Sequence, residues 1–191
     1  MKSQIILKGL MFIMCTAILI SSISCSSGSS PETSVGDFFN AIIASDLLKA
    51  KSYLIANDSS LEFTNERNKN VVIKVFSMMQ YDILSTNVKG ESAIVKVKVT
   101  TPDMGKITLK VISDVIAKVA KMSENGESIE TSDSEKIAEQ YFNQMLSEPK
   151  VQMTTSELEI KLTKEKSKWL INGDKKFKDV ITGNMLKSNA E

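Results

Sequence analysis

Residues 81–101 carry the first clear sheet signal in the chain and read YDILSTNVKGESAIVKVKVTT. The segment Lys89-Gly90-Glu91 separates two arms, residues 81–88 and 92–101, as in a β-hairpin whose turn contains glycine. In the second arm every other residue is apolar, as in an antiparallel strand with one buried face: Ala93, Val95, Val97 and Val99. We therefore predict a hairpin that buries one face.

The other face of this arm carries Lys96 and Lys98. Antiparallel strands that are buried on one side usually place charges on the side that faces water, so we expect a solvated face here. The alternative is a face that binds a ligand or another protein through these lysines.

A second hairpin is predicted near the end of the chain. Apolar residues alternate with polar ones at Leu158, Ile160 and Leu162, and residues 164–167 form a turn before a strand at 168–171 that contains Trp169. Residues 172–174 end this strand. The residues that follow suggest a short amphipathic helix that closes an open end of the domain: Phe177, Val180, Ile181 and Met185.

Three helices are predicted before the first hairpin. The first covers residues 34–44 and begins with a capping box at Ser34 and Asp37, and a shorter helix follows from residue 46. The third spans residues 64–79, although its Val and Ile content leaves a strand over residues 71–76 as the alternative. The first helix would bury Val35, Phe38, Phe39, Ile42 and Ile43, and the second Leu47, Leu48, Ala50 and Leu54.

Two more helices are predicted between the hairpins. Thr101 as N-cap and Pro102 at the first helical position begin one of them, unless the alternation at residues 107–111 extends the sheet instead. A capping box at Ser132 and Glu135 begins the other, which Pro149 ends. The predicted apolar stripes are Met104, Ile107, Val111, Ile112, Val115, Ile116 and Val119, and then Ile137, Ala138, Tyr141, Phe142, Met145 and Leu146.

This order of elements predicts an α+β domain over residues 34–186. The helices would pack on one face of a strongly curved antiparallel sheet, with a helical insertion between the two hairpins. We expect the polar run at 187–191 to be a disordered tail.

Residues 1–24 have the order of an export signal. Lys2 and Lys8 precede an apolar run, which small residues close before Cys25. An uncleaved membrane anchor is the weaker interpretation, because a spanning helix needs about 18 consecutive apolar residues. The segment 22–25, Ser-Ile-Ser-Cys, resembles the lipobox of bacterial lipoproteins. The resemblance implies cleavage between Ser24 and Cys25 and acylation of Cys25, which then holds the protein on the extracytoplasmic face of the membrane; residues 25–33 would be a flexible tether.

Composition excludes several kinds of site. Loss of the first 24 of 191 residues leaves a mature chain of 167 residues. This chain has 22 basic and 23 acidic residues and therefore a net charge of −1. Without an excess of basic residues, the composition gives no indication of nucleic-acid binding. The chain has no histidine, which removes histidine-dependent triads and zinc sites. With Cys25 acylated no disulfide framework remains, and we expect no cofactor and no metal.

Two stretches resemble a known family. Residues 35–41 with 46–50, and the late segment 168–174, are similar to the two ends of nuclear-transport-factor-two-like (cystatin-like) lipoproteins of bacteria. That resemblance implies a cone of helices around a bent sheet, with a tryptophan in the strand before the last loop. The step at residues 101–103 into the inserted helices is similar to a subset of this family whose function is not established. The cone would enclose an apolar pocket, for which we expect this lining: Phe38, Phe39, Ile42, Tyr81, Tyr141, Phe142 and Trp169.

Three functions follow from these patterns. We rank first a non-catalytic domain that binds a small apolar ligand or a peptide, and second an envelope assembly module that uses the lysine-bearing sheet face. The third is an enzyme of the isomerase or dehydratase type, for which Asp82 beside Tyr81, or Tyr141 with a nearby carboxylate, are the candidates. The aromatic pair Tyr141 and Phe142 also fits a core stripe without any ligand.

Overall fold

The computed structural model describes residues 29–63, 65–126, 128 and 130–185. The predicted signal segment, the cleavage site at Ser24 and Cys25, and the predicted tail at 187–191 lie outside these residues. The elements are α1 (Pro31–Ile43), α2 (Leu47–Lys51), α3 (Glu66–Ser77), β1 (Gln80–Lys89), β2 (Ser92–Pro102), α4 (Met104–Glu124), α5 (Thr131–Met145), β3 (Met153–Glu165), β4 (Lys168–Asn172) and α6 (Lys175–Ile181).

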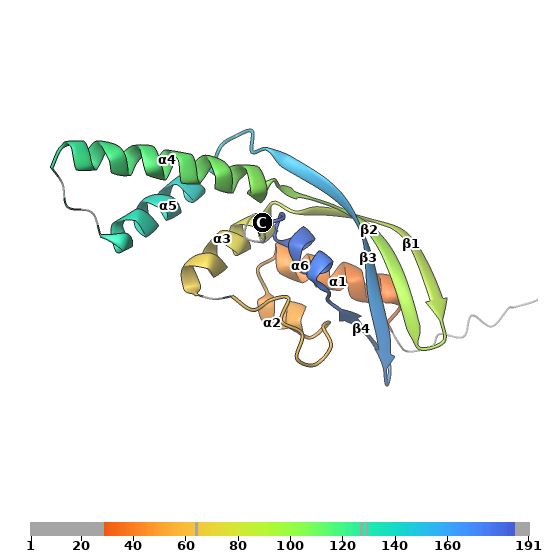
Figure 1. The fold of residues 1–191 in the computed structure, drawn as a ribbon. Helices are drawn as coiled ribbons and strands as arrows, with labels where there is room; N and C mark the ends of the chain where they lie inside the picture. The colour runs from red at the N-terminus through yellow and green to blue at the C-terminus, as the bar shows by residue number, and fades with distance from the viewer. Residues whose placement is uncertain (1–28, 64, 127, 129, 186–191) are drawn as a thin grey trace, which may run out of the picture.

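The four strands form one antiparallel sheet in the order β1-β2-β3-β4. Helices α1 and α6 lie on one side of this sheet, and the α4–α5 hairpin extends away from the end where β2 stops and β3 starts (Figure 1). The predicted α+β class, both hairpins and the helical insertion between them are confirmed.

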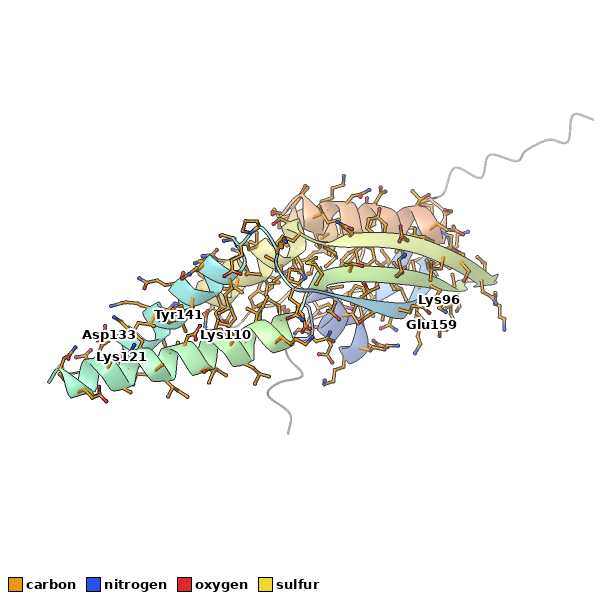
Figure 2. All side chains as sticks on the ribbon, turned by 90° about the horizontal axis from the view of Figure 1, so that it is seen from above. Lys96, Lys110, Lys121, Asp133, Tyr141 and Glu159 are labelled. Carbon is orange, nitrogen blue, oxygen red and sulfur yellow. The ribbon has the colours of Figure 1, made fainter. Side chains whose placement is uncertain are left out.

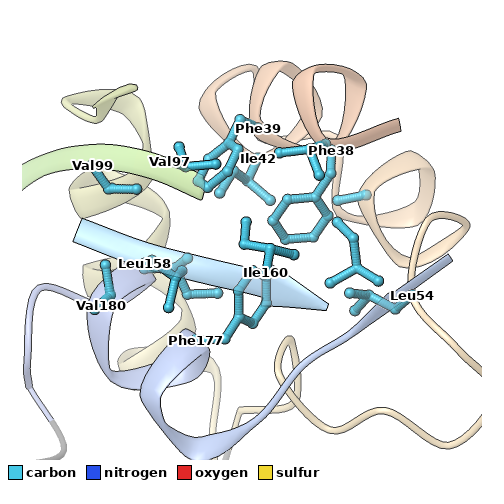
Figure 3. Packing of buried hydrophobic residues seen from close by; sticks show 14 of the residues in the cluster. Phe38, Phe39, Ile42, Leu54, Val97, Val99, Leu158, Ile160, Phe177 and Val180 are labelled. Atoms are coloured by element: carbon cyan, nitrogen blue, oxygen red, sulfur yellow. The ribbon is translucent and has the colours of Figure 1, made fainter. Parts of the chain in front are cut away.

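The main core lies between the sheet and the helices that cover it. In the register of β2 and β3, Val95 faces Ile160 and Val97 faces Leu158, so the predicted apolar positions form one continuous buried face. Phe38 and Phe177 pack against these residues from α1 and α6, with 5.4 Å between their ring centroids (Figure 3). Burial of each aromatic or branched apolar side chain stabilises the fold by about 1.5–3 kcal/mol.

The β4 edge of the sheet is covered by the segment after α2. The backbone N–H of Ile171 donates to the Tyr53 carbonyl at 2.7 Å, and the Ile55 N–H donates to the Ile171 carbonyl at 3.0 Å. Such a bridge uses the hydrogen-bonding groups that an open edge would leave unpaired. The connection between α2 and α3 is therefore attached to the sheet.

A second apolar cluster joins the α4–α5 hairpin to the domain. It lies where α3 meets the two inserted helices and comprises Val71, Val75, Met104, Ile107, Val111 and Leu146, with Tyr141, Phe142 and Met185 packed against it. Residues 71–76 are helical and not a strand, because their apolar spacing serves this cluster on one side and the main core on the other. Residues 107–111 are likewise helical and do not extend the sheet.

Several predicted helix starts are wrong. Helix α1 begins at Pro31 after the N-cap Ser30, whose hydroxyl accepts from the Thr33 N–H at 3.2 Å, so Ser34 is a buried helical residue and the last three residues of the predicted tether, residues 31–33, are helical. Both serines have N-cap chemistry, but only Ser30 precedes a proline at the first helical position.

The two inserted helices also begin elsewhere than predicted. Asp103, not Thr101, caps α4 and accepts from the Lys106 N–H at 3.2 Å, while Pro102 is still part of β2. Glu130 is the N-cap of α5, and the Asp133 carboxylate accepts from its N–H at 3.3 Å. Glu135, expected in a capping box, instead pairs with Arg67 on α3.

Three residues that were predicted to be buried are exposed: Leu48, Ile112 and Ile116. Leu48 is 85% exposed, because the five-residue helix α2 turns this side chain to the surface. On α4 only the first half of the predicted stripe is buried. Ile112 is 50% and Ile116 64% exposed, like Leu109 at 65%, because the 21-residue helix has α5 on one side only. The helical spacing of the apolar residues predicted the stripe, but it did not predict how much of the stripe another helix would cover.

Candidate functional site

A cavity of about 280 Å³ lies between α3 and α5. It is at the outer side of the second apolar cluster, on the side of the domain where the α4–α5 hairpin joins it (Figure 1). Its lining comes from the N-cap and the first half of α3, from the middle of α5 and from Met185, which follows α6. The lining residues are Asn65, Arg67, Asn68, Val71, Glu135, Ala138, Glu139, Phe142 and Met185.

The floor of the cavity is apolar. Val71 on α3 faces α5, where Ala138 and Phe142 are one helical turn apart and therefore on the same side of the helix. Met185 closes a third side, from a chain segment distant in sequence from both helices. Because the Ala138 side chain is small, it leaves the cavity open between its larger neighbours.

The rim of the cavity is charged. The Arg67 guanidinium pairs with Glu135 through Nη1, and its Nε lies 3.3 Å from Glu139 Oε2. These contacts join α3 to α5 across the mouth of the cavity. Since all three side chains are partly exposed, the pairs contribute at most about 1 kcal/mol to stability. One guanidinium faces two carboxylates, so the three groups together carry a net charge of −1.

A second depression shares Asn65 with this cavity. It is a shallow groove of about 750 Å³ between α2 and the start of α3, and it contains Leu47, Leu48, Leu61 and Phe63 with Lys51, Glu62, Glu66 and Lys69. Leu48 is mostly in solvent. The cavity between α3 and α5 is smaller but more enclosed than this groove, and ligand sites are usually concave.

The residues expected to line a pocket lie mostly in the packed core. Phe38, Phe39 and Ile42 are fully buried between the sheet and the helices (Figure 3). Phe39 stacks on Tyr81 with 4.8 Å between the ring centroids. Trp169 is buried in the same cluster, with Lys164 Nζ 5.8 Å from its ring centroid. Four of the expected lining residues are thus buried in the main core, and Tyr81 is partly buried against it.

The two aromatic residues of α5 are placed differently. Tyr141 packs against the second apolar cluster, beside α4 (Figure 2). Phe142 belongs to the same cluster and also lines the cavity between α3 and α5. It is the one expected lining residue that reaches this cavity.

The residues proposed for an enzyme are not arranged as an acid and a base in a pocket. Burial raises the pKa of the Tyr81 hydroxyl above its usual value, although the bond to Asn40 Oδ1 at 3.1 Å opposes this shift. Asp82 points to solvent with 62% of its side chain exposed, and it pairs with Lys98 at 2.7 Å. This carboxylate lies at the surface and pairs with a lysine, so the enzyme alternative loses its main support.

The lysine-bearing sheet face is made of ion pairs. Lys96 Nζ lies 2.6 Å from Glu157 Oε2, and their hydrogen bond raises the pKa of the Lys96 ammonium and lowers the pKa of the Glu157 carboxyl. Lys98 Nζ lies 2.7 Å from Asp82 Oδ2, and this hydrogen bond raises the pKa of the Lys98 ammonium. Lys96 and Glu159 lie on the sheet, at the far end of the molecule from the α4–α5 hairpin (Figure 2). The mixed charges fit the solvated face that we expected.

The sequence reasoning missed most of the cavity lining. One signal was visible: Arg67 is the only arginine beside 23 lysines, and an arginine fork suits carboxylate pairing better than a lysine does. Glu135 and Glu139 are four residues apart and so project from one face of a helix. Nothing in the sequence placed this face against α3.

Three further searches bear on the site. Among the residues described, no group of three or more His, Cys, Asp or Glu side chains could hold a metal ion. Within the same part of the chain, no helix combines the length and the hydropathy that a membrane crossing requires. Comparisons with protein-family models, with curated proteins and with solved structures find no match.

Proposed function

We propose that this protein is a lipid-anchored, extracytoplasmic binding protein that takes an apolar group into the cavity between α3 and α5 without catalysing a reaction. The observation that carries the proposal is the combination of an apolar floor with a charged rim in a space of about 280 Å³. Ligand sites are typically concave, largely apolar and supplied with a few polar groups that orient the ligand. The proposal also includes the cone-like fold that the resemblance to the nuclear-transport-factor-two-like lipoproteins implies.

The position of the cavity suits a protein attached through Cys25. Helix α1 begins at Pro31, so residues 25–30 would span at most roughly 20 Å when extended. The start of α1 lies near the β1–β2 turn, whereas α3 and α5 lie at the opposite end of the domain (Figure 1). A lipid on Cys25 would therefore hold the sheet end near the membrane and leave the cavity accessible.

The other two functions have less support. An assembly role through the lysine-bearing face would have to break the pairs of Lys96 with Glu157 and of Lys98 with Asp82 before a partner could use these charges. An enzyme would need a buried acid, and Asp82 is exposed. We keep both as alternatives of lower rank.

Filling the cavity tests the proposal. Burial of five methylenes at about 0.8 kcal/mol each predicts a Kd of about 1 mM for n-hexanol. At 10 mM hexanol this affinity stabilises the folded protein by about 1.4 kcal/mol, which raises Tm by about 3–5 °C relative to a protein without the cavity. We expect Ala138→Phe, which fills the cavity with a ring, to abolish this difference in thermal melts.

A matched control separates filling from the cost of an added ring. Ala117→Phe makes the same substitution on the exposed side of α4, away from the cavity lining. This variant should respond to hexanol as the unchanged protein does. Equal responses of Ala138→Phe and Ala117→Phe would contradict the proposal.

A further inference from the structure

We propose that the group bound in the cavity between α3 and α5 carries a positive charge next to its apolar part, as an alkylammonium does. This inference rests on the proposed function and adds the chemical class of the ligand. Its basis is the charge at the rim, where Arg67 faces both Glu135 and Glu139.

The two glutamates are only partly neutralised. They are four residues apart on α5, where like charges repel each other, and they share a single guanidinium. A second cation at the rim would balance the remaining charge of −1. The apolar floor excludes water on one side of such a cation and so strengthens its attraction to the carboxylates.

The surrounding charges do not alter this balance. On α3 Lys69 pairs with Glu66 at 3.0 Å, and on α5 Lys136 pairs with Asp133 at 3.5 Å. Each pair sums to zero. Lys74 on α3 is a further cation, which donates to the Asn143 carbonyl of α5 at 3.1 Å, but it lies outside the cavity lining. The lining itself therefore keeps a net charge of −1.

An anionic group would find its best donors occupied. Arg67 already pairs with one glutamate through Nη1 and with the other through Nε. At the start of α3 the Asn65 side chain accepts from the Asn68 N–H at 2.8 Å, so this backbone donor is capped. An anion that approached Arg67 would come close to both carboxylates and be repelled by them.

The floor also favours a cation over an anion. Phe142 contributes an aromatic ring to the lining, and the faces of aromatic rings attract ammonium groups. The cavity thus offers carboxylates, a ring and aliphatic carbon to one occupant. These are the partners that an alkylammonium group needs.

Three probes with the same hydrocarbon chain test the charge preference: n-hexylammonium, n-hexanol and n-hexanoate, titrated by NMR at low salt and neutral pH. We expect hexylammonium to bind about fivefold tighter than hexanol, and hexanoate to bind weaker than hexanol. Salt at about 0.5 M should remove most of the difference, because the rim is exposed to solvent.

Two substitutions at the rim should act in opposite directions. Arg67→Gln removes the competing cation and should raise the affinity for hexylammonium about fivefold. Glu139→Gln should lower it by a similar factor and leave hexanol binding unchanged. Lys69→Gln is the matched control, because it removes a positive charge from α3 outside the cavity lining, and it should change the affinity by less than twofold.

The outcomes separate the two proposals. If hexanol and hexylammonium bind equally and Glu139→Gln changes neither, the cavity binds apolar groups and the charge inference is overturned. If hexanoate binds tightest and Arg67→Gln abolishes its binding, the site takes anions and the inference is again overturned. If none of the three probes binds, or if Ala138→Phe leaves all three affinities unchanged, the proposed function fails as well.

Discussion

Gly173→Ala lowers the free energy of unfolding by about 3 kcal/mol. A Cβ at this position would lie 2.2 Å from Ser60 Oγ and 2.7 Å from Asp58 Oδ2, much closer than atoms in contact approach each other. The Gly173 N–H donates to this same Asp58 oxygen at 2.8 Å, so the clash cannot be relieved without loss of the hydrogen bond. Overpacking and a lost, partly buried hydrogen bond each cost about 1–3 kcal/mol. Urea denaturation measures the combined loss in the free energy of unfolding.

Gly36→Ala is the matched control for this prediction. Gly36 lies inside α1, and a Cβ there would meet the Tyr81 hydroxyl at an ordinary contact distance of 3.5 Å. Alanine in a helix interior stabilises by about 0.5–1 kcal/mol relative to glycine. The same substitution should therefore change stability in opposite directions at the two positions. Equal stability of the two variants would show that Asp58 and Ser60 do not hold the end of β4 as described.

We expect Cys25→Ser to abolish the lipid attachment that the sequence predicts. The sequence predicts that the mature protein begins at Cys25 and carries acyl chains there, and each methylene buried in the bilayer contributes about 0.8 kcal/mol to anchoring. Serine offers no thiol for acylation. We expect the unchanged protein to incorporate radiolabelled fatty acid and to lack its first 24 residues by mass spectrometry, and the Cys25→Ser variant to incorporate no label.

Cys15 provides the control within the same segment. It is part of the apolar run and follows Met14, so it lacks the small residue that precedes Cys25. Cys15→Ser should be labelled and processed like the unchanged protein. Equal labelling of Cys25→Ser, or a mature protein that keeps its first 24 residues, would remove the lipid anchor from the proposed function.

The sheet and the main core were predictable because their signals are local. Alternation at Val95, Val97 and Val99 and again at Leu158 and Ile160 indicates strands with one buried face. In the structure these positions are buried, and Val95 pairs with Ile160 and Val97 with Leu158. Helix boundaries were less predictable, because Ser30 and Ser34 both have the chemistry of an N-cap. The difference between them is the proline that follows Ser30 at the first helical position.

The cavity could not be predicted from local patterns. It exists because the α4–α5 hairpin folds back on α3, which brings Arg67 to Glu135 across 68 positions of sequence. Periodicity identified the apolar side of each helix but not which helix would cover it. The resemblance placed a pocket between the sheet and the helices, where Phe38, Phe39 and Ile42 leave no exposed surface.

Methyl NMR of the labelled protein locates the binding site directly. Intermolecular contacts from bound hexylammonium should appear at methyl groups of the cavity floor, Val71, Ala138 and Met185, and not at Val97 or Ile160 in the main core. Contacts centred instead on Leu47 and Leu48 in the groove beside α2, or on Ile94 on the open sheet face, would show that the ligand site is not the cavity between α3 and α5.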